Sequence, residues 1–297
     1  MAITAQSVKE LREKTGAGMM DCKKALTECD GDIAKAIDWL REKGIAKAAK
    51  KSDRIAAEGL SRVAVNGNTA LIFEVNSETD FVAKNEQFLN VLDTIEATLL
   101  ANKPASIEAA LSTEVEGDTL ETIIANATAT IGEKISLRRF EIVEKADDEV
   151  FGSYMHMGGR ISALTVLKGD ASAEVAKDIA MQVASMAPAY VSRNEMPTSV
   201  VEHERNIQLE ILKNDEKLAG KPEKVLEGIV EGRVSKNLKD MCLVEQEFFK
   251  NPDIKIGQYV KEAKAEIVSF LRYAVGEGIE KREDNFAEEV MNQAFGK

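Results

Sequence analysis

The sequence has few of the residues on which common sites depend. Its 297 residues include two histidines, His156 and His203, which lie far apart and exclude a histidine-rich metal site. The three cysteines, Cys22, Cys29 and Cys242, contain no CxxC pair, which argues against a disulfide framework and fits a reducing cytosol. No hydrophobic run approaches the roughly 18 residues of a membrane span, and the N-terminal segment has no hydrophobic signal core. We therefore expect a cytoplasmic protein without membrane contact.

Positive charge is also scarce. Lysine and arginine total 39 against 51 aspartates and glutamates, a formal net charge of −12. Such a surface repels phosphate backbones and anionic lipids, so we expect no direct nucleic-acid partner. Hydrophobic residues make up 44% and charged residues 30%, the balance of a folded globular chain. The length corresponds to about two domains.

Motifs of nucleotide-binding and hydrolytic enzymes are missing. The chain has no GxxxxGK[ST] phosphate loop, no GxGxxG after a strand, no HExxH and no GxSxG. His156, in SYMHMGGR, reads either as a structural histidine in a loop or as a general base. By composition and spacing the chain is an α+β protein with no visible catalytic centre, and we expect no metal or other cofactor.

Residues 1–45 predict a bundle of three short helices. The first runs from about Ala5 to Lys14 and the second begins near Met19. Asp32 is placed to cap the third helix, which Gly44 is expected to end. Residues 46–58 form a basic linker helix, which is either solvated or a partner contact.

Residues 59–148 predict a first core subdomain. Asn66-Gly67 between two apolar runs indicates a β-hairpin with a type I′ turn. Ser77 and Asp80 form a capping-box pattern, with Thr79 as another candidate cap, before a helix that carries Phe81 and Phe88 on one face. Residues 101–130 are weakly helical in pattern, and residues 135–144 alternate like a strand.

Residues 149–197 and 251–280 predict a second, related subdomain. We expect strands over 161–167 and 266–275, a helix over 173–186 and a short strand over 189–197. Residues 198–250, inserted between the two parts, have the seam of an antiparallel coiled-coil hairpin, with Ile207 and Ile211 among its apolar positions. Residues 281–297 predict a last helix.

Two segments closely match a known family. LREKTGAGMMDCKKAL (11–26) and EVNSETDFVAK (74–84) resemble signatures of bacterial elongation factor Ts, and GSYMHMGGRI and YAVGEGIEK are similar to it as well. The resemblance covers nearly the whole chain. It implies an N-terminal bundle similar to ubiquitin-associated domains, two α+β core subdomains with antiparallel sheets, the inserted helical hairpin and a C-terminal helix.

The resemblance implies a function without covalent chemistry. Members of this family bind elongation factor Tu loaded with GDP and speed GDP release. The segment Thr79–Val82 would then displace Mg²⁺ from the partner, with Phe81 as an apolar wedge and Asp80 disturbing the network around the metal. The residues that would also contact the partner are Met19, Met20, Lys23, Lys24, His156, Phe286 and Val290.

Several alternatives stay open at this point. Periodicity by itself places Phe81 in the core, and Asp80 by itself is a helix cap. The chain could instead be an interaction scaffold without exchange activity, or a hydrolase that uses His156 and a carboxylate. A homodimer, a one-to-one complex and a two-to-two complex are all compatible with the hairpin.

Overall fold

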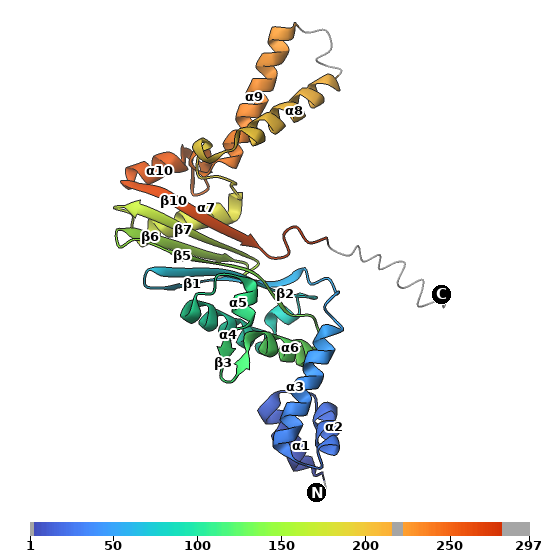
Figure 1. The fold of residues 1–297 in the computed structure, drawn as a ribbon. Helices are drawn as coiled ribbons and strands as arrows, with labels where there is room; N and C mark the ends of the chain where they lie inside the picture. Colours follow the sequence, from blue (N-terminus) through green and yellow to red (C-terminus); the bar gives the residue numbers. More distant parts are fainter. Residues whose placement is uncertain (1–2, 216–221, 281–297) are drawn as a thin grey trace. The chain divides into compact units, whose positions relative to one another are not determined.

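The chain folds into ten described helices and small antiparallel sheets, an α+β architecture (Figure 1). The computed structural model describes residues 3–215 and 222–280. Its contacts divide the chain into two units. Among the described residues, one unit takes in 3–62, 73–142 and 274–280, and the other takes in 63–72, 143–215 and 222–273. The finer division into six segments stays a prediction.

The N-terminal bundle follows the sequence pattern closely. Its helices are α1 (Ala5–Thr15), α2 (Met19–Glu28) and α3 (Ile33–Ala49), and they enclose a small core that includes Leu11, Cys22 and Leu26. The Asp32 side chain accepts a hydrogen bond from the Lys35 backbone N–H at 3.1 Å and so caps α3, as predicted.

The prediction that Gly44 ends the third helix is wrong. Gly44 is buried inside α3, which continues to Ala49. A Cβ atom at Gly44 would lie 2.7 Å from Oδ1 of Asn126 and 3.6 Å from Cβ of Ala129, both on α6 (Leu120–Ile131). The glycine therefore lets α3 and α6 approach closely, and the helix pays about 1 kcal/mol in propensity for that contact.

The predicted hairpin is present with its turn shifted by one residue. Strands β1 (Glu58–Asn66) and β2 (Thr69–Ser77) are joined by Gly67 and Asn68, so Asn66 still belongs to β1. Gly67 has a φ of 60°, whereas Asn68 does not have a positive φ. A positive φ at the first turn residue only is the pattern of a type II′ turn, not the predicted type I′.

The helix expected to start at Ser77–Asp80 begins later. Residues Val82–Lys84 form a 3₁₀ turn, η1, and helix α4 runs over Glu86–Asn102. Its cap is Asn85, whose side chain accepts hydrogen bonds from the backbone N–H groups of Gln87 and Phe88. The capping roles predicted for Ser77, Thr79 and Asp80 are therefore wrong, because Asn85 lies where α4 begins.

The weak pattern over residues 101–130 contains more than helix. It forms α5 (Ile107–Leu111), then a hairpin of two short strands, β3 (Glu114–Val115) and β4 (Asp118–Thr119), and then α6. Strand β5 (Ser136–Glu144) follows as predicted and completes a sheet with the order β1-β2-β5.

A buried carboxylate joins β2, β5 and the turn at Gly276. Glu74 is fully buried and accepts hydrogen bonds from Arg138 at 2.9 Å, Arg139 at 2.6 Å and the Gly276 N–H at 2.8 Å. Burial by itself raises the pKa of the Glu74 carboxyl, but these hydrogen bonds outweigh it and hold that pKa below its ordinary value.

The other unit is built on a second three-stranded sheet. Its order is β10-β7-β6, formed by β6 (Glu149–His156), β7 (Ile161–Gly169) and β10 (Ala265–Ala274), with β6 and β7 antiparallel. Helix α7 (Ala173–Met186) packs on β6 and β7, and the core continues to α10 (Ile256–Glu262). The predicted helix 173–186 and strands 161–167 and 266–275 are confirmed.

Two details of this unit differ from the prediction. The short strand expected over 189–197 is wrong, since Tyr190 makes an isolated bridge with Cys242 and Arg193–Glu195 forms the 3₁₀ turn η2. The chain returns from the helical hairpin through η4 (Leu243–Glu245) and the pair β8 (Glu247–Phe248) and β9 (Asn251–Lys255).

The inserted helical hairpin is present, but its seam excludes two of the predicted apolar positions. Helices α8 (Thr198–Lys213) and α9 (Glu223–Met241) pack side by side through a cluster centred on Val230, Val234 and Leu238. Ile207 and Ile211 are 38% and 47% exposed, so they lie outside this seam. Within the described residues no helix is long and apolar enough to cross a membrane.

Candidate functional site

The candidate site is a short exposed tip between β2 and α4. Strand β2 ends at the buried Ser77, and Thr79, Asp80 and Phe81 are then exposed before Val82 is buried again. Phe81 is 84% exposed, more than any other large hydrophobic residue in the described part of the chain. A residue with this exposure is not part of the core, so the core placement that periodicity favours for Phe81 is wrong.

Fixed points on both sides hold this tip. On one side the Ser77 hydroxyl donates to the Thr79 carbonyl at 2.9 Å. On the other side Val82 is only 7% exposed, and the Lys84 N–H donates to the Phe81 carbonyl at 3.2 Å. Asp80 and Phe81 therefore project from a backbone that is anchored immediately before and after them.

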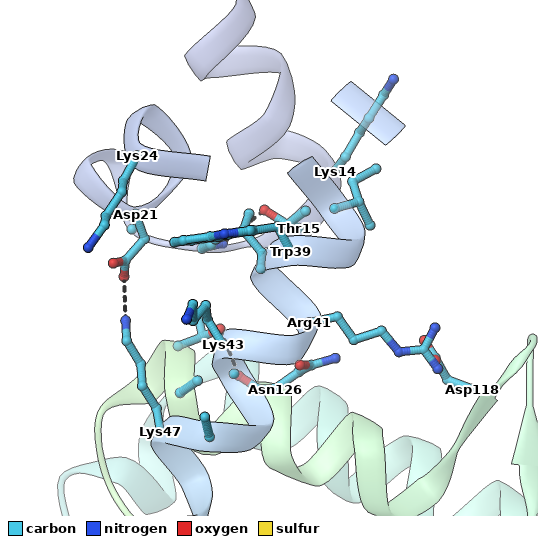
Figure 2. A pocket seen from close by; sticks show the side chains of 18 of the residues that line it. Lys14, Thr15, Asp21, Lys24, Trp39, Arg41, Lys43, Lys47, Asp118 and Asn126 are labelled. Atoms are coloured by element: carbon cyan, nitrogen blue, oxygen red, sulfur yellow. Dashed lines mark hydrogen bonds and ion pairs between the residues drawn. The ribbon is translucent and has the colours of Figure 1, made fainter. Parts of the chain in front are cut away.

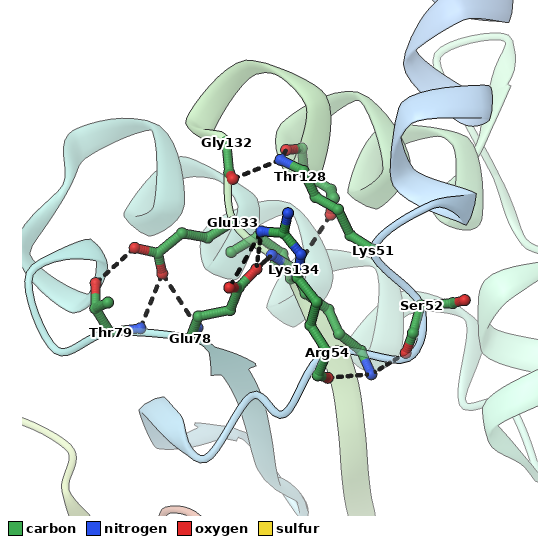
Figure 3. A network of polar contacts seen from close by, with 10 residues as sticks. Lys51, Ser52, Arg54, Glu78, Thr79, Thr128, Gly132, Glu133 and Lys134 are labelled. Atoms are coloured by element: carbon green, nitrogen blue, oxygen red, sulfur yellow. Dashed lines mark hydrogen bonds and ion pairs between the residues drawn. The ribbon is translucent and has the colours of Figure 1, made fainter. Parts of the chain in front are cut away.

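A carboxylate from a distant turn adds a third anchor (Figure 3). Glu133 accepts hydrogen bonds from the backbone N–H groups of Glu78 at 3.1 Å and Thr79 at 2.9 Å. The Thr79 hydroxyl also donates to Glu133, at 2.6 Å. In return, Glu78 accepts from the Lys134 N–H at 2.7 Å and pairs with Arg54 at 3.2 Å.

The Asp80 carboxylate is available for a contact outside the chain. Within residues 3–215 and 222–280 it has neither a hydrogen-bond nor an ion-pair partner, in contrast to Glu78 two positions earlier. A free carboxylate next to an exposed aromatic ring combines a negative charge with an apolar wedge within two residues.

The predicted partner residues of the bundle lie on one exposed side of α2. Met19 and Met20 are 60% and 74% exposed, and Lys23 and Lys24 are exposed as well. Each methionine precedes a lysine by four residues, a spacing that places the two side chains on the same helix face. Methionine adapts its shape to a partner surface, and lysine favours an acidic one.

A cleft of about 520 Å³ lies beside α2 (Figure 2). Its cations outnumber its carboxylates, because Asp21 and Asp118 face six basic side chains. Asp21 pairs with Lys47 at 2.9 Å, and the Lys43 ammonium lies 5.5 Å from the centre of the Trp39 ring. The basic residues that line the cleft are Lys14, Lys24, Arg41, Lys43, Lys47 and Lys50. This part of an acidic protein is thus locally electropositive.

The prediction that His156 lies in a loop is wrong. His156 is the last residue of β6, where it pairs with Ile161. Its Nδ1 lies 3.1 Å from the Tyr154 hydroxyl, and the two rings are 5.9 Å apart. Among the described residues no carboxylate or nucleophilic hydroxyl of a serine is hydrogen-bonded to it. The geometry therefore gives no support to the hydrolase hypothesis.

Phe286 and Val290 lie outside the described residues.

The sequence did not point to Glu78, Glu133, Lys134 or Arg54 as site residues. Glu133 and Lys134 follow Gly132, the left-handed cap of α6 with a φ of 92°. That helix-stop pattern was the one signal available, and it predicts a turn without predicting what the turn contacts.

Comparison with known families gives one match. A family model described as elongation factor TS matches residues 78–277, which is more than half of the chain. The matched range includes the tip, Glu133 and His156, and it begins after the N-terminal bundle.

Proposed function

Since the chain belongs to the elongation factor Ts family, whose members are nucleotide exchange factors for elongation factor Tu, we propose that its Thr79–Val82 segment displaces Mg²⁺ from the partner and so releases GDP. Phe81 acts as the wedge in an apolar slot of the GTPase domain, and Asp80 disturbs the network around the metal. The observation that carries this proposal is the 84% exposure of Phe81 on an anchored backbone.

The properties of the metal explain how a small wedge has a large effect. Mg²⁺ demands near-ideal octahedral geometry and neutralises charge between the GDP phosphates and the protein around them. A slight shift of the loop that supports the metal therefore weakens its binding. Without the metal, the phosphates repel nearby carboxylates, and GDP dissociates faster.

Thermodynamic coupling sets the requirement for the rest of the interface. If the factor weakens GDP binding by a given ratio, GDP weakens factor binding by the same ratio. A coupling of about 5 kcal/mol corresponds to nearly four powers of ten in affinity. Contacts away from the wedge must offset this energy, and the exposed Met20 and Lys24 of α2 belong to a surface suited to that purpose.

Stopped-flow release of fluorescent GDP from elongation factor Tu tests the proposal. We expect the wild-type protein to accelerate release, and the acceleration to saturate with factor concentration. An unchanged release rate would contradict the exchange function. Binding to Tu that neither depends on the nucleotide nor changes its release would support the scaffold hypothesis instead. Light-scattering mass measurement of the complex distinguishes a one-to-one from a two-to-two assembly.

A further inference from the structure

The turn between α6 and β5 contacts two segments that are remote in sequence. Glu133 contacts residues 78 and 79, while the Lys134 ammonium donates to the carbonyls of Ser52 and Arg54 in the linker after α3. Figure 3 shows these residues converging on the turn. We propose that Glu133 is a positioning residue, which holds the Thr79–Phe81 tip in the conformation that exchange requires. This inference rests on the function proposed above.

Both carboxylate oxygens of Glu133 accept hydrogen bonds from residues 78 and 79. Oε2 accepts both backbone N–H groups, of Glu78 and Thr79, and Oε1 accepts the Thr79 hydroxyl. Hydrogen bonds to an ionised acceptor are about twice as strong as neutral ones. Three of them fix the two residues that directly precede Asp80.

The turn itself is held in place, so it can serve as a rigid support. The Gly132 carbonyl accepts a hydrogen bond from the Lys51 ammonium at 2.5 Å. Burial lowers the pKa of Lys51, and the neighbouring cations Arg54 and Lys47 contribute in the same direction. The Lys134 N–H donates to the Glu78 carboxylate, and the Glu78 N–H donates to the Glu133 carboxylate. The turn and the segment before the tip therefore hold each other by hydrogen bonds in both directions.

A positioning role differs from a stabilising one because the tip is at the surface. Thr79 is exposed, so water can replace the lost partner of its N–H if Glu133 is removed. The fold then loses little, but residues 78–81 gain conformational freedom. Contacts away from the tip hold the factor on its partner whether or not the wedge is correctly placed. Within that complex only the fraction with the wedge correctly placed is competent, so the maximal exchange rate falls to that fraction of the wild-type rate.

The test compares Glu133→Ala and Glu133→Gln with the wild type in GDP release over a range of factor concentrations. Glutamine is isosteric, its amide oxygen can accept both backbone N–H groups, and its NH₂ can donate to the Thr79 hydroxyl. We expect Glu133→Ala to lower the maximal rate about tenfold with an unchanged half-saturating concentration, and Glu133→Gln to stay within about twofold of wild type. Glu121→Ala, at the exposed start of α6, the helix that precedes Glu133, is the matched control with wild-type behaviour.

A second readout does not depend on the partner. Amide hydrogen exchange at Glu78 and Thr79 in the free protein should be slow in the wild type and in Glu133→Gln, and at least tenfold faster in Glu133→Ala. Thr79→Val, which removes only the hydroxyl donor, should lower the maximal rate in the wild type but have no further effect in Glu133→Ala. This pair of variants keeps the test valid if one of them folds poorly.

The failures of the two ideas are distinguishable. No acceleration by the wild type would overturn the exchange function. An active wild type with an equally fast Glu133→Ala at saturation would overturn the positioning role, as would equal amide exchange in the two proteins. A Glu133→Ala variant that changes only the half-saturating concentration would show a partner contact instead, and would also overturn it.

Discussion

Phe81 is 84% exposed, whereas Phe88, seven residues later, is completely buried. The difference arises from where the helix begins. Phe88 lies in the first turn of α4 and points into the core, while Phe81 precedes the Asn85 cap and the 3₁₀ turn η1. The same residue type therefore has a structural role at one position and is free for a partner at the other.

Replacing these two phenylalanines should separate exchange from stability. Full burial of a phenylalanine side chain in a slot contributes about 1.5–3 kcal/mol, so Phe81→Ala should slow GDP release at saturating factor by about 10–100-fold. Its free energy of unfolding should stay within about 0.5 kcal/mol of wild type. Phe88→Ala should instead lower that free energy by about 3–5 kcal/mol. Denaturant unfolding and stopped-flow release measure the two effects, and a strongly destabilised Phe81→Ala would contradict the structure.

Hydrophobic periodicity placed Phe81 in the core for a specific physical reason. Phe81 and Phe88 have helical spacing, and Ser77 with Asp80 forms a capping pattern, so a helix from residue 78 was the simplest interpretation. The structure uses Asn85 as the cap instead, because its side chain accepts hydrogen bonds from two N–H groups of α4. Periodicity cannot distinguish two candidate caps eight residues apart.

The long regular elements were predictable where burial is periodic. Helix α7 has its predicted bounds, and α1 and α2 begin where expected, because apolar spacing and capping residues agree there. Gly44 misled the prediction because a helix stop and a close helix contact both favour glycine. The contacts of Glu133 depend on chain segments about 55 residues apart, and no local pattern encodes such a pairing.

Asp80 should matter for exchange and not for folding. Its carboxylate caps no helix and has no partner among the described residues, so Asp80→Asn should leave the unfolding free energy within about 0.5 kcal/mol of wild type. The same variant should slow GDP release several-fold, because the charge that disturbs the metal network is gone. Asp93→Asn, at an exposed position of α4 where the carboxylate pairs with Arg62, is a comparison variant expected to release GDP at the wild-type rate. An Asp80→Asn protein with full exchange activity would limit the mechanism to Phe81.

Removal of Mg²⁺ should reduce the advantage that the factor gives. If the tip acts by displacing the metal, chelation with EDTA performs the same step in its absence. GDP release from Tu alone should then accelerate, and the further acceleration by the wild-type factor should shrink. The wild type and Phe81→Ala should also differ less than in excess Mg²⁺. A factor-dependent acceleration that is the same with and without the metal would show that the wedge acts on GDP by another route.

The lysines of α2 should contribute to affinity rather than to the maximal rate. Lys23 and Lys24 are exposed beside Met19 and Met20, away from the tip in sequence. Lys23→Ala/Lys24→Ala should raise the half-saturating factor concentration about 2–30-fold, since each of two exposed charge pairs contributes roughly 0.2–1 kcal/mol and the effect is salt-dependent. The maximal rate should stay near wild type. Raising the ionic strength should narrow the gap between the double variant and wild type, and a gap independent of salt would contradict an electrostatic contact.

The pH dependence of stability should report the buried Glu74. Because hydrogen bonds hold its folded-state pKa below the ordinary value of 4.5, its ionised form favours the folded state above pH 4.5. This contribution is lost as the pH falls through the lower, folded-state pKa. Glu74→Gln removes the carboxylate and leaves Arg138 and Arg139 without their charged partner, and the loss at pH 7 should be about 3 kcal/mol, the lower end for a buried pair because both arginines are partly exposed.

Urea unfolding of wild type and Glu74→Gln at pH 7, 5, 4 and 3 measures this dependence. The difference between their unfolding free energies should be constant from pH 7 to 5 and should shrink below pH 4.5, since protonation of Glu74 removes the same charge that the substitution removes. Glu121→Gln, at an exposed site, should follow the wild-type curve throughout. Parallel curves for wild type and Glu74→Gln down to pH 3 would mean that Glu74 keeps its proton balance on unfolding, and its hydrogen bonds would then not stabilise the ionised form.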